Sequence, residues 1–64
     1  MTKDSRITVA AKNFVERFGD DAPAEAKRRA EELRRAGNAD SAVTWTQIYE
    51  EVKVLVERGG KTAH

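Results

Sequence analysis

The sequence predicts an all-α fold, a small three-helix bundle, on three observations. Apolar residues recur at helical spacing in three separate segments, and no segment alternates between apolar and polar residues as a strand would. Glycine or proline separates the segments. The expected helices cover about 5–18, 23–36 and 40–58, and their short connections favour antiparallel neighbours. At 64 residues, the chain is expected to form a single helical domain over 1–64.

The first expected helix carries an unbroken apolar stripe. Its members follow the spacing i, i+3, i+4, i+7, i+8 and i+11, so they share one face. They are Ile7, Ala10, Ala11, Phe14, Val15 and Phe18. Asp4 or Ser5 can cap the start, and Gly19 stands where a left-handed residue would end the helix. Val9 alone lies on the opposite face, where a lone surface valine is ordinary.

The second expected helix has a stripe made almost entirely of alanine. The stripe consists of Ala22, Ala26, Ala30, Leu33 and Ala36. Because only Leu33 is large, a neighbouring helix can approach closely, but little apolar area is buried. Asp20 and Asp21 ahead of Pro23 are typical of a capped helix start. The helix should end at 37–38.

The third expected helix is the longest and carries the largest apolar residues. Seven residues fall within one arc at ~100° per residue. They are Ala42, Trp45, Ile48, Tyr49, Val52, Leu55 and Val56. Asp40 can cap the start, the glycines at 59–60 stop the helix, and Val43 and Val54 project together on the far side. This helix should be the spine of the core, followed by a short disordered tail at 61–64.

Composition argues against several function classes. The chain has no cysteine and one histidine, His64, so neither a disulfide nor a metal site is expected. Charged residues make up 36% of the chain but nearly cancel at +1, whereas a nucleic-acid binder normally shows a clear basic excess. No apolar run approaches the ~18 residues of a membrane span, and residues 1–6 do not resemble a secretory signal. The cytoplasm is therefore the expected location, with no membrane association.

No arrangement of residues points to catalysis. Glu31 and Glu32 are adjacent on a helix, as are Glu50 and Glu51, so each pair points ~100° apart and cannot converge on one substrate atom. The segment 59–62 lacks the first glycine and the following helix of a phosphate-binding loop. We therefore expect no catalytic residue, no cofactor and no small-molecule substrate.

Basic residues on the second helix leave a nucleic-acid interpretation open. Four of them could contact phosphates as a weak binder. They are Lys27, Arg28, Arg34 and Arg35. Interleaved carboxylates instead favour a salt-bridged solvent face, in which each i,i+4 pair contributes ~0.2–0.5 kcal/mol. The expected pairs are Glu25–Arg29, Lys27–Glu31, Arg28–Glu32 and Glu31–Arg35.

Five residues are candidates for a protein interface. Trp45 and Tyr49 stand one helical turn apart, which fits either core residues or interface anchors. Val52 and Val56 continue the same arc. Arg29 projects into the alanine stripe, where it would either tie the helices together or contact a partner chain.

A shortage of core residues favours association. A domain of this size buries only ~60% of the surface of its unfolded chain, and no disulfide or metal can compensate. At ~1.5 Å per residue, the third helix is about 28 Å long and the others about 21 Å, so part of it should face another chain. We expect a self-associating interaction module, most simply a two-fold dimer through the third helix. An open arrangement with that helix paired to a second copy is the alternative fold.

Four short segments resemble a group of short bacterial helical proteins of unknown function. They are 18–22, 29–33, 36–38 and 45–48. In that group they read His-Gly-Asp-Asp-Ala, Arg-Ala-x-Glu-Leu, Gly-Asp, and a Trp followed three residues later by an apolar residue. This chain departs by having Phe18 in place of the His and Asn38 in place of the Asp. The resemblance implies a compact, cytoplasmic bacterial protein and brings no activity or functional residue.

Overall fold

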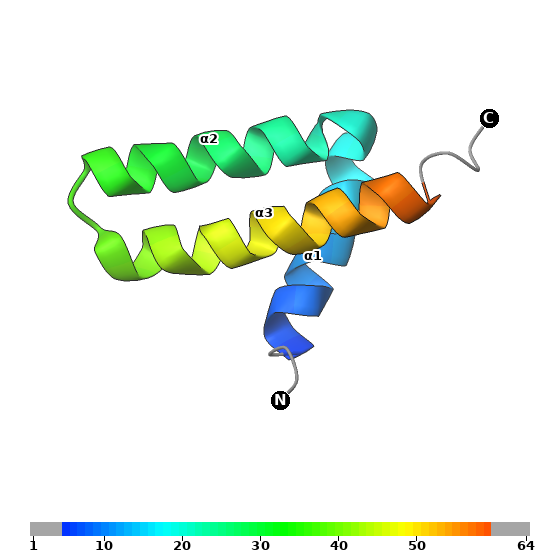
Figure 1. The fold of residues 1–64 in the computed structure, drawn as a ribbon, viewed down its shortest axis with the longest axis horizontal. Coiled ribbons are helices and arrows are strands. Elements are labelled where there is room, and N and C mark those ends of the chain that lie inside the picture. Colours follow the sequence, from blue (N-terminus) through cyan, green and yellow to red (C-terminus); the bar gives the residue numbers. More distant parts are fainter. Residues whose placement is uncertain (1–4, 60–64) are drawn as a thin grey trace.

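The computed structural model describes residues 5–59 and is helical apart from the short turn at 36–38 (Figure 1). Its elements are α1 (Ser5–Phe18), the short 3₁₀ helix η1 (Gly19–Asp21), α2 (Ala22–Arg35) and α3 (Ala39–Gly59). No strand occurs in this range, so the predicted all-α class is confirmed. Each predicted α-helix boundary lies within one residue of the observed one. The predicted cap Asp4 and the predicted tail 61–64 lie outside the described residues.

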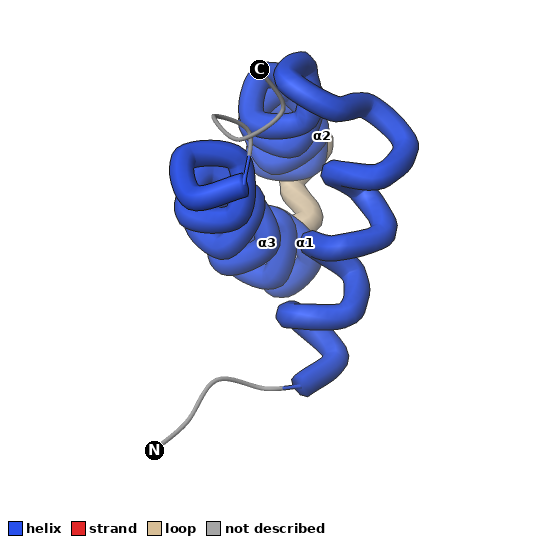
Figure 2. The backbone as a smooth tube through the Cα atoms, turned by 90° about the vertical axis from the view of Figure 1, so that its right-hand side faces the viewer, coloured by secondary structure: helices blue, strands red, loops and turns tan. Residues whose placement is uncertain are grey.

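The helices are arranged as an antiparallel hairpin crossed by a third helix. α2 and α3 run side by side, and α1 crosses one side of this pair at a steep angle (Figures 1 and 2). Both α1 and α2 pack mainly against α3 and contact each other little. Because α1, η1 and α2 follow one another without a coil segment, they form one bent helical rod. The expected three-helix bundle is therefore met only in part.

Two glycines allow the chain to change direction, with a bend at Gly19 and a reversal at Gly37. Gly19 has φ +60° and Gly37 has φ +83°, in the left-handed region that favours glycine. Gly19 ends α1 as predicted. At the end of α2, the Asn38 N–H donates to the Leu33 carbonyl at 2.9 Å and the Gly37 N–H donates to the Arg34 carbonyl at 3.1 Å. This Schellman pattern satisfies the last carbonyls of α2.

Two predicted side-chain caps are wrong. Asp21 occupies the N-cap position of α2, but its side chain makes no capping hydrogen bond, because residues 19–21 already turn as a 3₁₀ helix. Asp40 lies inside the first turn of α3 rather than ahead of it. The capping side chain is Asn38, whose Oδ1 accepts a hydrogen bond from the Ser41 N–H at 3.4 Å.

The core lies where the three helices meet, and it is thin. Nine apolar residues of the described chain are buried, and five of them are alanines. The nine are Ile7, Ala11, Phe14, Ala22, Ala26, Ala30, Ala42, Ile48 and Val52. The Cα positions extend 39 × 27 × 14 Å, so the shortest direction holds about two layers of helix. Such a core supplies little hydrophobic stabilisation for the number of residues that it orders.

The alanine stripe of α2 is confirmed over most of its length. Ala22, Ala26 and Ala30 are buried against the neighbouring helices. Leu33 is only partly buried and Ala36 is exposed. Both lie toward the Gly37 end of the hairpin, away from the end where α1 joins α2 (Figure 1). The stripe therefore closes the core at one end of the hairpin and leaves apolar surface at the other.

Candidate interaction site

Three aromatic rings from α1 and α3 meet beside α2. The Phe14 ring centroid is 4.5 Å from that of Phe18 and 5.3 Å from that of Trp45, with tilted and edge-to-face geometry respectively. Spacing of i,i+4 places both phenylalanines on one face of α1. Phe14 is buried, while Phe18 and Trp45 keep part of their surface exposed. Such tilted pairs add stabilisation beyond their buried area.

Arg29 of α2 completes this aromatic cluster. Its guanidinium carbon lies 5.7 Å from the Phe14 ring centroid and 5.5 Å from the Trp45 ring centroid. Both distances are within the ~6 Å of a cation–π contact. Arg29 as a whole remains exposed. The sequence left open whether Arg29 ties the helices together or faces a partner; in this fold its guanidinium contacts rings of both neighbouring helices and is still accessible from outside.

A shallow groove continues from Arg29 toward the turn between α2 and α3. It has a volume of about 370 Å³ and is lined by Arg29, Glu32, Leu33, Ala36 and Trp45. Its lining combines three apolar side chains with one cation and one carboxylate. Arg29 and Trp45 are among the predicted site residues, whereas Leu33 and Ala36 are not, because their spacing predicts that both lie in the buried stripe.

The other predicted interface residues differ in what they offer a partner. Tyr49 and Val56 are partly buried, and the Lys53 Nζ lies 5.1 Å from the Tyr49 ring centroid. Val52 has no exposed surface at all. Its assignment to an interface is therefore wrong, and it belongs to the core. Projection put Val52 on the right arc but could not show that it would be buried in one cluster with residues of α1 and α2.

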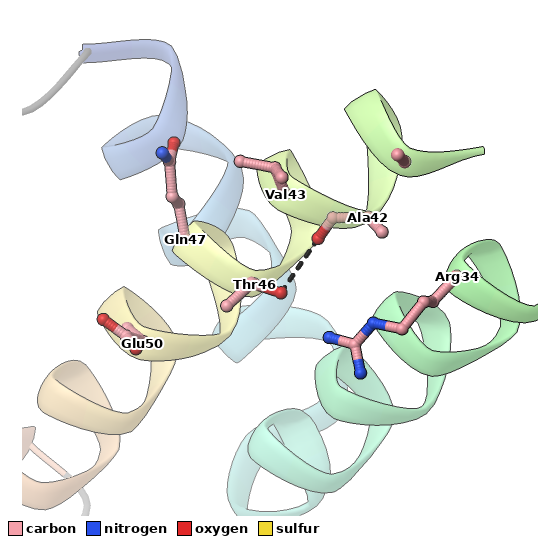
Figure 3. A pocket seen from close by; sticks show the side chains of 7 residues that line it. Arg34, Ala42, Val43, Thr46, Gln47 and Glu50 are labelled. Carbon is pink, nitrogen blue, oxygen red and sulfur yellow. Dashed lines mark hydrogen bonds between the residues drawn. The ribbon is translucent and has the colours of Figure 1, made fainter. Parts of the chain in front are cut away.

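The face of α3 opposite the core is exposed, and Gln47 at its centre also lines a groove with Arg6, Ile7 and Ala10 of α1. Val43 is 57% exposed and Val54 is 42% exposed, as their predicted position on the far side requires. Gln47 and Glu50 lie between them along the helix and are also exposed. Figure 3 shows Val43, Gln47 and Glu50 directed away from α2. This face joins two large apolar side chains with two polar ones.

A second groove lies between this face and α2. It has a volume of about 500 Å³. Its lining residues are Arg34, Ala39, Ala42, Val43, Thr46, Gln47 and Glu50 (Figure 3). The Thr46 hydroxyl donates to the Ala42 carbonyl at 2.9 Å, so it is already satisfied. Arg34 points from α2 toward α3, and within residues 5–59 neither Arg34 nor Glu50 forms an ion pair.

Arg28, one of the four cations proposed to bind phosphate, is engaged by its own helix. Its Nη2 donates to Glu25 Oε1 at 2.5 Å, and its Nη1 lies 3.7 Å from Glu32 Oε2. The hydrogen bond and charge of Glu25, followed by the charge of Glu32, raise the pKa of Arg28 above its usual value. Because Glu25 pairs with Arg28, the predicted Glu25–Arg29 pair is replaced by the contact of Arg29 with the aromatic rings.

The remaining cations of the phosphate interpretation are dispersed. Arg34 turns toward the groove beside α3, whereas Lys27 and Arg35 lie exposed on α2. At ~100° per residue, Glu31 projects between Lys27 and Arg35 on the outer face. Of the four predicted i,i+4 ion pairs, only Arg28–Glu32 forms in the described part of the chain. The basic residues of α2 therefore do not make one uninterrupted positive patch.

Two further observations concern residues 5–59 as a whole. No three side chains of histidine, cysteine, aspartate or glutamate gather there as a metal site would require. None of the described helices combines the length and apolar character needed to cross a membrane.

Comparisons with protein-family models, curated proteins and solved structures give no match. The resemblance to short bacterial proteins stays a prediction.

Proposed function

We propose that this protein is a non-enzymatic interaction module that associates with itself through α3. The observation that carries this proposal is the exposure of Val43 and Val54 on the face of the longest helix that points away from the core. The thin, alanine-rich core supports it, since small domains without disulfides or metals are usually completed by a partner. Dimerisation would supply the bundle that α1, α2 and α3 form only in part.

The aromatic cluster offers a second contact surface for the same module. Trp45 and Arg29 are residue types enriched at binding hot spots, and each presents an accessible edge beside the apolar groove. Tyr49 and Val56 extend the partly exposed apolar surface along α3. The cytoplasmic and bacterial setting suggested by the sequence is part of this proposal.

Sedimentation equilibrium from micromolar to millimolar protein tests self-association. We expect the average mass to rise from monomer toward dimer over this range. The melting temperature should rise with it, because association stabilises the folded state by mass action. A monomer at every concentration, with a melting temperature that does not change, would contradict the proposal.

Weak nucleic-acid binding through Lys27, Arg28, Arg34 and Arg35 is the alternative function. Titration of nonspecific DNA and RNA over a salt series separates the two proposals. A phosphate binder loses affinity steeply as salt rises, whereas an interaction module binds little at any salt. The ion pairs of Arg28 and the dispersal of the other cations favour little binding to nucleic acid at any salt concentration.

A further inference from the structure

We infer that the exposed face of α3 binds a second copy of α3 that runs antiparallel to it across a two-fold axis. This inference rests on the proposed self-association and specifies its geometry. The face, here named the valine stripe, consists of Val43, Gln47, Glu50 and Val54. Its spacing of four, three and four residues is the spacing of a coiled-coil contact line.

The valine stripe is complementary to itself in one direction only. The midpoint between Gln47 and Glu50 is also the midpoint between Val43 and Val54. An antiparallel copy centred there sets each Val43 against the Val54 of the other chain and each Gln47 against the other Glu50. The Gln47 amide can then donate to the Glu50 carboxylate. A parallel copy would instead set Glu50 against Glu50, and the two like charges would repel each other.

Charges beside the stripe favour the same direction. Asp40 and Arg58 are eighteen residues apart, which is five helical turns, so they lie on the same side of α3. Both are exposed, and their midpoint lies within half a residue of the midpoint of the stripe. The antiparallel copy therefore brings Asp40 of each chain beside Arg58 of the other. A parallel two-fold copy would instead place the Asp40 and Arg58 side chains of the two chains on opposite sides of the interface, and this pairing would be lost.

The groove beside α2 adds a third charge match. Gln47 lines this groove together with Arg34, whose guanidinium points from α2 toward α3 (Figure 3). In the antiparallel arrangement, Glu50 of the second copy lies opposite Gln47 and so arrives at the same groove. Arg34 then gains a carboxylate, whereas within residues 5–59 of its own chain it forms no ion pair.

Cysteine cross-linking tests the direction directly, because the chain contains no cysteine of its own. A Val43→Cys chain is mixed with a Val54→Cys chain under mild oxidation. We expect a disulfide-linked heterodimer from the mixture and little cross-linking from either variant alone. In the antiparallel arrangement, identical residues are about 16 Å apart along the helix, beyond the reach of a disulfide. Cross-linking of each variant with itself would instead show a parallel dimer and overturn the inference.

Val9→Cys provides a matched control. Val9 is 56% exposed, like Val43, but it lies on α1 and outside the valine stripe. Mixtures of Val9→Cys with either α3 variant should give only the background level of cross-linking. An equal yield from these mixtures would mean that collisions, rather than a defined interface, form the disulfides, and the inference would fail.

A charge exchange supplies an independent readout. Asp40→Arg and Arg58→Asp should each raise the dimer dissociation constant several-fold when studied alone. Mixing the two variants should restore affinity, because every Asp40–Arg58 position then again holds opposite charges. A mixture no tighter than either variant alone would remove Asp40 and Arg58 from the interface and contradict the proposed register.

The two proposals can fail separately. Val43→Asp and Val54→Asp should each shift the protein toward monomer, while Val9→Asp should not, with circular dichroism confirming that all three variants stay helical. A dimer unaffected by the two α3 variants would leave self-association standing and overturn the valine stripe as its interface. A protein that is monomeric at every concentration would overturn both.

Discussion

Arg29 links all three helices through a single side chain. It projects from α2, and its guanidinium meets a ring of α1 and a ring of α3. An exposed cation–π contact is worth about 0.5–1 kcal/mol. We therefore expect Arg29→Ala to lower the free energy of unfolding by about 1–2 kcal/mol. Urea unfolding followed by the fluorescence of Trp45, the chain's single tryptophan, measures both the stability and the environment of that ring.

Arg35→Ala is the matched control for that measurement. Arg35 is exposed on the same helix and has no ring or ion pair within the described residues. Its replacement should change stability by less than about 0.5 kcal/mol. Equal effects of the two replacements, with unchanged Trp45 emission, would show that the rings do not hold the Arg29 guanidinium.

Glycine is needed at position 37, in the turn between α2 and α3, because of its backbone conformation and not because a side chain would lack room. Nothing lies within 4 Å of where a Cβ would be, so a side chain would fit, but φ is +83°. A left-handed conformation costs an ordinary L residue about 1–2 kcal/mol. Gly37→Ala should lower stability by that amount in thermal or urea unfolding. Gly37→Asn should lower it less, because asparagine tolerates this conformation; equal losses would contradict this account.

At the scale of the elements, α2 is held by the closeness of its neighbours rather than by large side chains. Ala26 has no exposed surface, so a larger residue there would push neighbouring helices apart. Overpacking a closed core typically costs 1–3 kcal/mol, and we expect Ala26→Leu to lose about that much on urea unfolding. Ala24→Leu, on the exposed side of the same helix, is the control and should be nearly neutral. Similar results for both would mean that α2 packs loosely.

The helix boundaries were predictable because the spacing of apolar residues and the conformation of glycine depend on neighbouring residues in the sequence. The three apolar stripes and the left-handed Gly19 and Gly37 place each helix end within one residue. The crossing of α1 was not predictable, since a stripe defines which face is buried but not the direction in which another helix crosses it. The assignment of Val52 failed for the same reason. Its position on the arc was right, yet its complete burial depends on how α1 and α2 pack against α3.

The candidate site was predictable in part. Arg29 stood out because an arginine within an alanine stripe needs a partner. Its partners could not be read from the sequence, since they depend on where Phe14 and Trp45 meet in space. The i,i+4 spacing of Phe14 and Phe18 was the available signal for an aromatic cluster, but the same spacing is equally typical of a buried core stripe.

At the scale of the whole molecule, α1 is the most weakly anchored helix. It packs on α3 but contacts α2 little, and its buried residues are Ile7, Ala11 and Phe14. Segments with few buried contacts open at lower free energy than the rest of a structure. We expect amide hydrogens of α1 to exchange faster than those in the middle of α2 and α3, as measured by NMR. Equal protection in all three helices would show that the chain opens only as one unit.

The bend at Gly19 allows α1 to pack on α3 of its own chain and not on α3 of another molecule. An alanine there would favour right-handed helical angles over the φ of +60° that makes the bend. A straight rod over residues 5–35 would be about 46 Å long and would carry α1 away from its own α3. The vacated apolar surface of α3 could then be filled only by α1 of another molecule, which is domain exchange. We therefore expect Gly19→Ala to convert the chain to a domain-exchanged dimer that dissociates slowly, which size-exclusion chromatography would detect. A variant that is less stable but unchanged in size would contradict this expectation. It would show that packing against α3 enforces the bend even without glycine.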